Sequence, residues 1–549
     1  MARSVKHIIL VLILGTMIIP AIQGYFTFVG EQPLHGDFQA VEPLKLNQEN
    51  WMNGSYQDKE VLRIEQELGF HNTLVRLNNQ LNFSIFGKPG AEGIIKGKNG
   101  QYYEADYIRA WTGDDYIGEL LLDKKLRQLR YLQRHLKDSL NIDLVLVLEP
   151  GKASVYPEDI PDRFTKAEPG ASNYDYICKR AEELDIELIN FNEYFIEIKD
   201  TARYPVYPKM GTHWSEFAMW YAADSLIKYI EYVRGIDMPE VIKDGIVISD
   251  SLRTSDNDIG VTLNLLFEPD YDPMPYPEYH FSIDYETHTQ PCVLAIADSY
   301  YWNIYNTKIP EKLFSNLDFW YFYRTIYPDT WFARLLDKDA EVIVDDIDLQ
   351  DEVEKMDVVL LMMTERFLYK FDRGFIDDLY RIYGKTSSRD ELTQYLNDIV
   401  KVDSWFSGII QSAKEDNMSL STKMELNARY MYWLEDADAY YACYGPRAKF
   451  REIKENEDWY LSARKNAIRK DISIDEQLME EARYVLSTAN PDALIKYDQL
   501  SAIKDSIISD SAWFASVMNE AKRYYLTEEE ILQAEAERVW DTMMLRDSL

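Results

Sequence analysis

The hydrophobic and polar positions of this 549-residue chain change their period along its length. Five unbroken apolar runs have the character of strands buried on both faces: DLVLVLEP (143–150), IELINF (186–191), CVLAIADSY (292–300), AEVIVDD (340–346) and MDVVLLMMTE (356–365). Helical periodicity occupies the segments between them, at 120–140, about 171–184 and 215–231. Strands that alternate with helices predict an α/β domain with a mostly parallel sheet and helices on both faces.

The pattern upstream of these runs is less regular. Residues 25–57 are rich in Gln and Asn with scattered Pro and Gly, and they indicate an extended lead-in. Helical patterns follow at about 58–80. The stretch IIKGKNGQYYE (94–104) predicts a hairpin, because Asn99-Gly100 suits the positive backbone angles of a primed turn.

Past about residue 376 the strand signal ends and an internal repeat of 54 residues begins. Five sets of positions keep this register: Trp405/Trp459/Trp513, Ile399/Ile453/Ile507, Ala413/Ala467/Ala521, Ser419/Ser473/Thr527 and Ala428/Ala482/Ala536. The Trp and the Ala eight positions later share a helix face, and the Ser or Thr suits the N-cap of a following helix. We expect each copy to be a helix pair and the copies to stack, either as a binding platform or as a packing appendage.

The N-terminal segment has the composition of an export signal. Arg3, Lys6 and His7 precede an apolar run from Ile8 to Ile22. Ala21-Ile22-Gln23 is a poor cleavage site, so residues 1–24 are either a cleaved signal peptide or an uncleaved membrane anchor. The predicted organisation is then an α/β domain at 25–375 and a helical repeat domain at 376–549, both extracytoplasmic, in the periplasm or at the cell surface.

Composition narrows the partners. Hydrophobic residues make up 46% and charged residues 28%, which is typical of globular chains. The net charge of −35 argues against nucleic acid and against an anionic membrane surface as partners. The 40 tyrosines and 12 tryptophans are compatible with a carbohydrate site and with ordinary cores. Three widely spaced cysteines form no CxxC motif.

Two short stretches carry candidate chemistry. In LAIADSYYW (294–302) an apolar strand ends at Asp298-Ser299, where α/β sheets place their ligands, so Ser299 is a candidate nucleophile. In KMGTHWSEF (209–217), His213 precedes a helix whose expected N-cap is Ser215, and it is a candidate general base. Each stretch alone is also typical of a turn or a helix cap.

Together the two stretches resemble the SGNH-hydrolase-like proteins of the alginate O-acetylation type, the AlgJ and AlgX family with its DHHW-motif relatives. GTHW stands in the place of the family's Asp-x-His-Trp loop, and IADSYYW in the place of its nucleophile strand. Three further family-like stretches are 93–104, 146–164 and 255–266, so the resemblance covers roughly residues 30–370. It implies an SGNH-like (flavodoxin-like) α/β fold.

The resemblance implies Ser299 as nucleophile and His213 as its base. The family's acid falls on Gly211, which has no side chain. Loss of the orienting carboxylate costs a serine triad on the order of 10⁴ in rate. Asp298 and Glu365, at strand ends, are the candidate replacements. A slow Ser-His dyad and a site that binds glycan without turnover are the alternatives.

Trp214, Tyr300 and Lys152 lie within the family-like stretches and are candidate substrate contacts. His280 and His288 flank FSIDYET upstream of the nucleophile strand and could supply a base, but no motif places them. The chain has no HExxH, no His pair at ligand spacing, no Walker loop and no GxGxxG, so we expect no metal site and no cofactor.

Two functions follow as hypotheses. The first is an acetyltransferase or acetylesterase acting on an extracellular polysaccharide; the resemblance implies a membrane-bound O-acyltransferase as acyl donor partner. The second is a non-catalytic glycan-binding or scaffold protein with a degenerate SGNH site. The presence or absence of a carboxylate at the His213 ring nitrogen that faces away from Ser299 discriminates between them.

Overall fold

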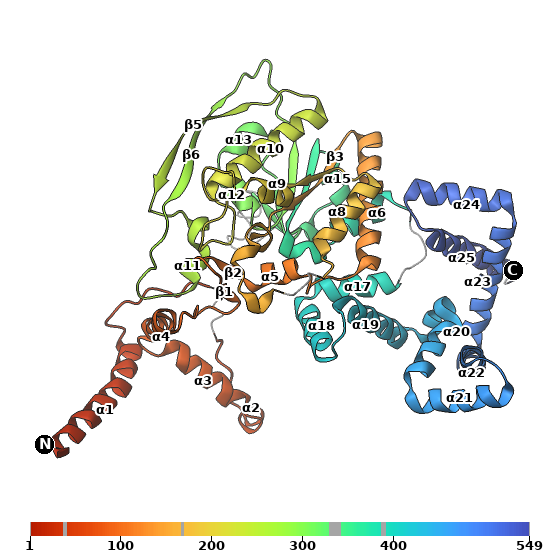
Figure 1. The fold of residues 1–549 in the computed structure, drawn as a ribbon, viewed down its shortest axis with the longest axis horizontal. Helices are drawn as coiled ribbons and strands as arrows, with labels where there is room; N and C mark the ends of the chain where they lie inside the picture. The colour runs from red at the N-terminus through yellow and green to blue at the C-terminus, as the bar shows by residue number, and fades with distance from the viewer. Residues whose placement is uncertain (1, 37–40, 166–169, 329–341, 386–390, 548–549) are drawn as a thin grey trace.

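The computed structural model describes residues 2–36, 41–165, 170–328, 342–385 and 391–547 (Figure 1). The described part contains four N-terminal helices, a central α/β body, two small antiparallel sheets and a C-terminal set of helices. The chain thus combines a mostly parallel α/β fold with an all-helical region, as the apolar patterns predict.

The central sheet has six strands in the order β4-β3-β10-β7-β8-β9. Their bounds are Leu188–Asn190 (β4), Asp143–Glu149 (β3), Val358–Thr364 (β10), Val293–Ala297 (β7), Phe319–Tyr321 (β8) and Thr325–Tyr327 (β9). All neighbouring pairs in this sheet are parallel except β8 and β9. Glu149 pairs with Thr364 in register, and Ala297 with Met362, so the carboxyl ends of β3, β7 and β10 meet at one edge.

One predicted strand differs from the structure. Residues 340 and 341 of the run AEVIVDD lie outside the described residues, and its described end forms a 3₁₀ turn at Val344–Asp346. Ile343 makes a single antiparallel bridge to Thr325. The run therefore borders the sheet at β9 without forming a strand in the described residues.

Alternate residues of each central strand enter two separate cores. Leu144, Leu146 and Leu148 of β3 pack with α6, α8 and α16, whereas Val145 and Val147 pack with α9, α10, α12 and α13. The helices of the first face are α6 (Glu119–Leu140), α8 (Asn173–Leu184) and α16 (Phe375–Tyr383). Those of the second are α9 (Phe191–Ile198), α10 (Glu216–Arg234), α12 (Tyr301–Tyr305) and α13 (Ile309–Leu313). Burial on both faces explains why the interiors of β3, β7 and β10 are apolar without alternation.

Short elements connect these layers. The helices are α5 (Ala105–Thr112), α7 (Lys152–Val155), α11 (Asp258–Thr262) and α15 (Leu349–Val353), and the hairpin strands are β1 (Ile94–Lys96), β2 (Tyr102–Glu104), β5 (Glu240–Ser249) and β6 (Met274–Ser282). The predicted hairpin at 94–104 is present, with φ of 51° at Asn99 and 80° at Gly100. β5 and β6 form a longer antiparallel pair at the side of the body (Figure 1).

The N-terminal helices are α1 (Ala2–Phe26), α2 (Gln48–Met52), α3 (Ser55–Glu67) and α4 (His71–Phe86). Val5–Phe26 is long and apolar enough to cross a membrane, and this exposed helix projects from the body (Figure 1). The end of α1 contacts the corner between α3 and α4, where Gly69 N donates to Pro20 O at 3.1 Å. The helical pattern at 58–80 divides there because Phe70 takes a left-handed conformation (φ 64°).

The C-terminal region forms three groups of three helices in the described residues: α17 (Glu391–Lys401), α18 (Asp403–Glu415) and α19 (Leu420–Glu435); α20 (Ala437–Glu455), α21 (Glu457–Lys470) and α22 (Ile474–Ala489); α23 (Pro491–Ser509), α24 (Ser511–Tyr524) and α25 (Glu528–Asp547). Ser419, Ser473 and Thr527 each accept from the backbone N–H three residues later, as predicted for caps. The expectation of a helix pair per copy is wrong, because a third helix fills the segment between one capped helix and the next Trp.

Candidate active site

Ser299 lies at the carboxyl edge of the sheet. β7 ends at Ala297, and the chain turns through Asp298 and Ser299 into α12. Asp298 holds this turn: one carboxylate oxygen accepts from Tyr300 N at 2.9 Å, and the other accepts from Thr364 N and Oγ1 at 2.8 and 2.6 Å. The turn is therefore fixed to β10, while Ser299 stays partly accessible.

His213 meets Ser299 at this edge. Its Nε2 is 3.0 Å from Ser299 Oγ, although 86 residues separate them in the sequence. Ser215 caps α10 by accepting from Ala218 N at 3.2 Å, as predicted, and its own N–H donates to Val206 O. These bonds fix the end of the loop that carries the imidazole.

Asp258, which was not among the candidates from the sequence, supplies the carboxylate at the imidazole. Its Oδ2 is 2.5 Å from His213 Nδ1. Its Oδ1 accepts from Thr212 N and Ile259 N, both at 2.7 Å. Because a carboxylate only accepts, Nδ1 carries the ring proton and Nε2 presents its lone pair to Ser299.

Asp298 and Glu365 are therefore wrong as replacements for the missing acid. Asp298 is buried, and both of its oxygens bind the turn and β10. Glu365 is buried on another contact, accepting from Ser154 Oγ, and burial raises the pKa of its carboxyl to about 7. Asp258 lies in SDNDIGVTLNLL, one of the family-like stretches, and that was the only signal for it in the sequence.

Gly211 cannot carry the family's acid in this backbone. A Cβ at this position would lie 2.3 Å from Pro208 Cγ and 2.8 Å from Ser255 O. The loop before His213 and the segment before Asp258 approach too closely for any side chain. The same approach brings Asp258 to the imidazole from a different segment.

The three expected substrate contacts, Trp214, Tyr300 and Lys152, are buried side chains that support the loop carrying His213 from the core side. Trp214 packs against the rings of Phe191 and Tyr300, at centroid distances of 6.2 and 5.2 Å. The hydroxyl of Tyr300 donates to Thr212 O at 2.7 Å. Both residues hold the His213 loop from inside, so as direct substrate contacts they are corrected.

Lys152 is only 1% exposed, and it too is corrected as a substrate contact. Its Nζ donates to the backbone oxygens of Pro208, Lys209 and Gly211, at 2.8, 2.9 and 2.8 Å. Burial lowers the pKa of this ammonium to about 7, against the opposing charge of Asp258. Lys152 therefore fastens the loop that carries His213.

Ser299, His213 and Asp258 open onto a cavity of about 730 Å³. Its other walls come from α10, β6, α12 and the segment after β5, through Glu216, Met219, Trp220, Leu252, Arg253, Ser255, Pro277, Tyr279, Trp302, Asn303, Asn306 and Thr307. Glu216 and Arg253 form an ion pair there. His280 pairs with Asp244 and His288 with the backbone of Asp284, so neither is placed at Ser299. Within the described residues, no group of three potential metal ligands is found.

The arrangement of a hydroxyl, an imidazole and a carboxylate leads to the comparison with known proteins. Residues 107–240 match a family model described as SGNH hydrolase-like domain, acetyltransferase AlgX. This segment is similar to the AlgX acetyltransferase domain. It contains His213 and ends before Asp258 and Ser299. The match confirms the resemblance first indicated by the two motifs, and a search of curated proteins returns no significant match.

Three solved structures show partial similarity to this chain. The O-acetyltransferase domain of Pseudomonas putida AlgJ is 16% identical with a TM-score of 0.34, over 52% of this chain and 98% of that one. Pseudomonas aeruginosa AlgX is 14% identical with a TM-score of 0.34, over 54% and 69%. Bacillus cereus PatB1 is 11% identical with a TM-score of 0.25, over 45% and 90%.

Proposed function

We propose that the protein is an exported SGNH-like O-acetyltransferase or acetylesterase that acts on an extracellular polysaccharide. The observation that carries the proposal is the continuous contact from Ser299 Oγ through His213 to Asp258, at 3.0 and 2.5 Å. The similarity of residues 107–240 to the AlgX acetyltransferase domain supports acetyl as the transferred group. The apolar helix α1 supports export, as a signal or as an anchor.

The first half-reaction places the acetyl group on Ser299. Nε2 of His213 takes the Oγ proton while Oγ attacks the acetyl carbonyl carbon. The tetrahedral intermediate collapses when the bond to the donor oxygen breaks, and His213 returns the proton to that oxygen. The donor would be presented by a membrane-bound O-acyltransferase partner, and the product is acetyl-Ser299.

The second half-reaction reverses these roles. His213 removes a proton from a sugar hydroxyl, or from water, which attacks the acetyl-serine carbonyl. The Ser299–acyl bond then breaks, and the imidazolium gives its proton back to Oγ. Asp258 keeps the proton on Nδ1 in both halves and stabilises the imidazolium while it exists.

Gly211 and the helical repeat both motivate the alternative of a non-catalytic glycan-binding or scaffold protein. Asp258 removes the first motive, because the imidazole has a carboxylate partner with two further hydrogen bonds of its own. We therefore place catalysis ahead of scaffolding.

The proposal is tested with a chromogenic acetyl ester and the full chain in detergent. We expect Ser299→Ala and His213→Ala each to lower turnover by at least about 10³-fold, with unchanged melting temperatures. Mass spectrometry of the wild type at short times should find one acetyl adduct on the 299-containing peptide. Equal turnover in the wild type and both variants would refute the catalytic assignment.

A further inference from the structure

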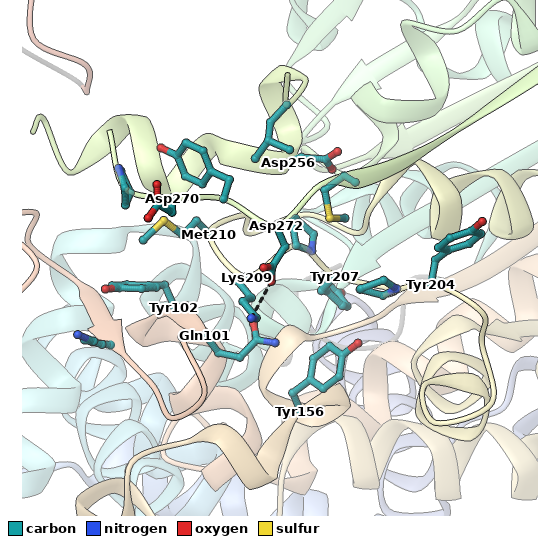
Figure 2. A pocket seen from close by; sticks show the side chains of 18 of the residues that line it. Gln101, Tyr102, Tyr156, Tyr204, Tyr207, Lys209, Met210, Asp256, Asp270 and Asp272 are labelled. Carbon is teal, nitrogen blue, oxygen red and sulfur yellow. Dashed lines mark ion pairs between the residues drawn. The ribbon is translucent and has the colours of Figure 1, made fainter. Parts of the chain in front are cut away.

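A second cavity, of about 640 Å³ (Figure 2), shares the lining residue Leu252 with the one that holds Ser299. Pro208, Lys209 and Met210, which lead directly into the His213 loop, form one of its walls. Leu252 lines both cavities, and Asp256 lies two residues before Asp258. The backbone that carries the imidazole and its carboxylate therefore separates two adjacent spaces.

Aromatic side chains from five separate segments line this second cavity, and Figure 2 labels four of them. They are Phe83 of α4, Tyr102 of β2, Tyr156 after α7, Tyr204 and Tyr207 after α9, and Tyr271 before β6. Tyr204 and Tyr271 line the cavity and are half-buried. Flat, partly exposed rings with polar tips suit the alternating apolar and hydroxyl faces of a sugar ring.

Two buried acceptors lie among the rings. Gln101 is 8% exposed, and its Oε1 has no hydrogen-bond partner among the described residues. Asp256 is fully buried, and neither of its oxygens has a hydrogen bond of normal geometry, although the Tyr276 hydroxyl lies near enough to influence it. A buried acceptor without a donor destabilises the fold, so Gln101 in particular calls for a ligand that brings a donor, while the Tyr276 hydroxyl already lies beside Asp256.

The charges around the cavity favour a neutral ligand. Lys209 pairs with Asp272 at 2.7 Å, and Lys199 pairs with Glu158 at 2.9 Å. The other charged residues with exposed side chains in the wall are Lys96, Arg203 and Asp270, two cations and one anion that stay solvated at the rim. Burial raises the pKa of Asp256 to about 7, so its carboxyl is also partly neutral at physiological pH. A ligand rich in hydroxyl donors and without net charge meets these conditions.

We propose that this cavity binds a neutral pyranose unit of the polysaccharide. The bound chain would then run from this cavity past Leu252, which lines both cavities, to Ser299. The sugar's hydroxyls donate to Gln101 Oε1 and Asp256, and its C–H face stacks on Tyr204. The inference rests on the proposed function and adds to it the site that holds the acceptor chain. Gln101 and Tyr204 are then residues for substrate binding that take no part in the acetyl step.

The test uses the full chain in detergent, with cellohexaose and chitohexaose as neutral probes and hexamannuronate as a charged one. Binding is measured by isothermal titration calorimetry on wild type, Gln101→Leu, Tyr204→Ala and Ser299→Ala. Tyr484→Ala, an exposed ring on α22, is the matched control. Turnover of the small acetyl ester is measured on the same samples, and melting curves establish that each is folded.

We expect at least one neutral hexasaccharide to bind, with affinity at least about tenfold weaker in Gln101→Leu and Tyr204→Ala. Ser299→Ala and Tyr484→Ala should bind as the wild type does, and ester turnover should fall only in Ser299→Ala. The inference is overturned if no neutral probe binds, if only hexamannuronate binds, or if Tyr484→Ala weakens binding equally. If binding depends on Gln101 while Ser299→Ala keeps full ester turnover, the proposed function fails and this sugar site stands.

Discussion

The α/β body and the C-terminal helices differ in what they bury. In the body, charged and polar side chains are buried beneath the site, among them Glu149, Lys152, Asp298 and Glu365. Among the described residues past 390, only Thr393 and Gln477 are buried polar side chains. Buried polar groups cost free energy unless they are bonded, so they mark where the fold needs defined geometry. The helices instead repeat a simple apolar contact.

The helical repeats are held together by apolar contacts and by one repeated hydrogen bond from a Trp to a Glu side chain. Ile453 and Leu478 are buried between helices of one copy, and Trp459 donates from its ring N–H to Glu481 at 2.7 Å. Trp513 makes the equivalent bond to Glu535 at 2.9 Å. The last copy also contacts the body, through Arg127 of α6 to Glu530. The first copy shares the core of the body, because Leu396, Phe406 and Met424 belong to the same buried cluster as the leucines of β3.

Of the substitutions that distinguish the two regions, Asp258→Asn in the body should have the largest effect, a loss of ester turnover. The amide can no longer keep the proton on Nδ1, so we expect ester turnover to fall by about 10⁴-fold with little change in melting temperature. Steady-state kinetics on the acetyl ester measure the loss. Asp298→Asn, which disturbs a buried turn, should lower the melting temperature as well, and a stable, fully active Asp258→Asn would contradict the assignment.

Leu478→Ala should have the opposite effect to Asp258→Asn: it should lower stability and leave ester turnover unchanged. Removing this fully buried side chain of α22 should cost the helical region about 2–5 kcal/mol. Ester turnover at 25 °C should not change, because the site lies in the other region. Calorimetry follows the unfolding transition. Leu461→Ala, at an exposed position of α21, serves as the control and should leave it in place.

The buried carboxyl of Glu365 should make the stability of the body depend on pH. Its folded pKa of about 7 lies above the unfolded value, so the folded state binds the extra proton. The contribution of the protonated Glu365 carboxyl to the free energy of unfolding is complete below about pH 4.5. It is lost as the pH rises to about 7, which lowers that free energy by roughly 3 kcal/mol. Between pH 4.5 and 7.5, the melting temperature of Glu365→Gln should change less with pH than that of the wild type. If the two proteins show the same change in melting temperature with pH, a group other than Glu365 is responsible for it.

Lys152→Met should have the smallest effect on rate. The loop before His213 loses three hydrogen bonds, and we expect turnover to fall by about 10- to 100-fold because the imidazole is held less accurately. Lys228→Met, which removes an exposed ion pair with Asp224 on α10, is the matched control. If both variants keep wild-type turnover, the loop does not depend on Lys152.

Much of this structure follows from local sequence signals. Unbroken apolar runs predict β3, β7 and β10, Asn99-Gly100 predicts its hairpin, and Ser215 predicts its cap. Each signal depends on neighbouring residues alone. The pairing of Ser299 with His213 needed two motifs and a family resemblance, because nothing local states which strand ends meet.

The misses have a physical cause in common. Asp258 reaches His213 across 45 residues, and no spacing rule connects them. Trp214 and Tyr300 stand beside the reactive residues in sequence, yet their side chains point into the core, which adjacency cannot reveal. The additional helices α20 and α23 follow the N-caps Asp436 and Asn490, and a repeat register based on the Trp positions does not take these caps into account.

Gly211 has one further consequence. Because the crowded backbone at Gly211 excludes a side chain, the carboxylate comes from a separate stretch of chain, and His213 keeps its hydrogen bond to Asp258 only while residues 255–259 pack against residues 208–212. Local unfolding of residues 255–259 would leave the central sheet intact but Ser299 without an oriented base. On heating, we therefore expect activity to be lost at a lower temperature than the one at which the protein unfolds.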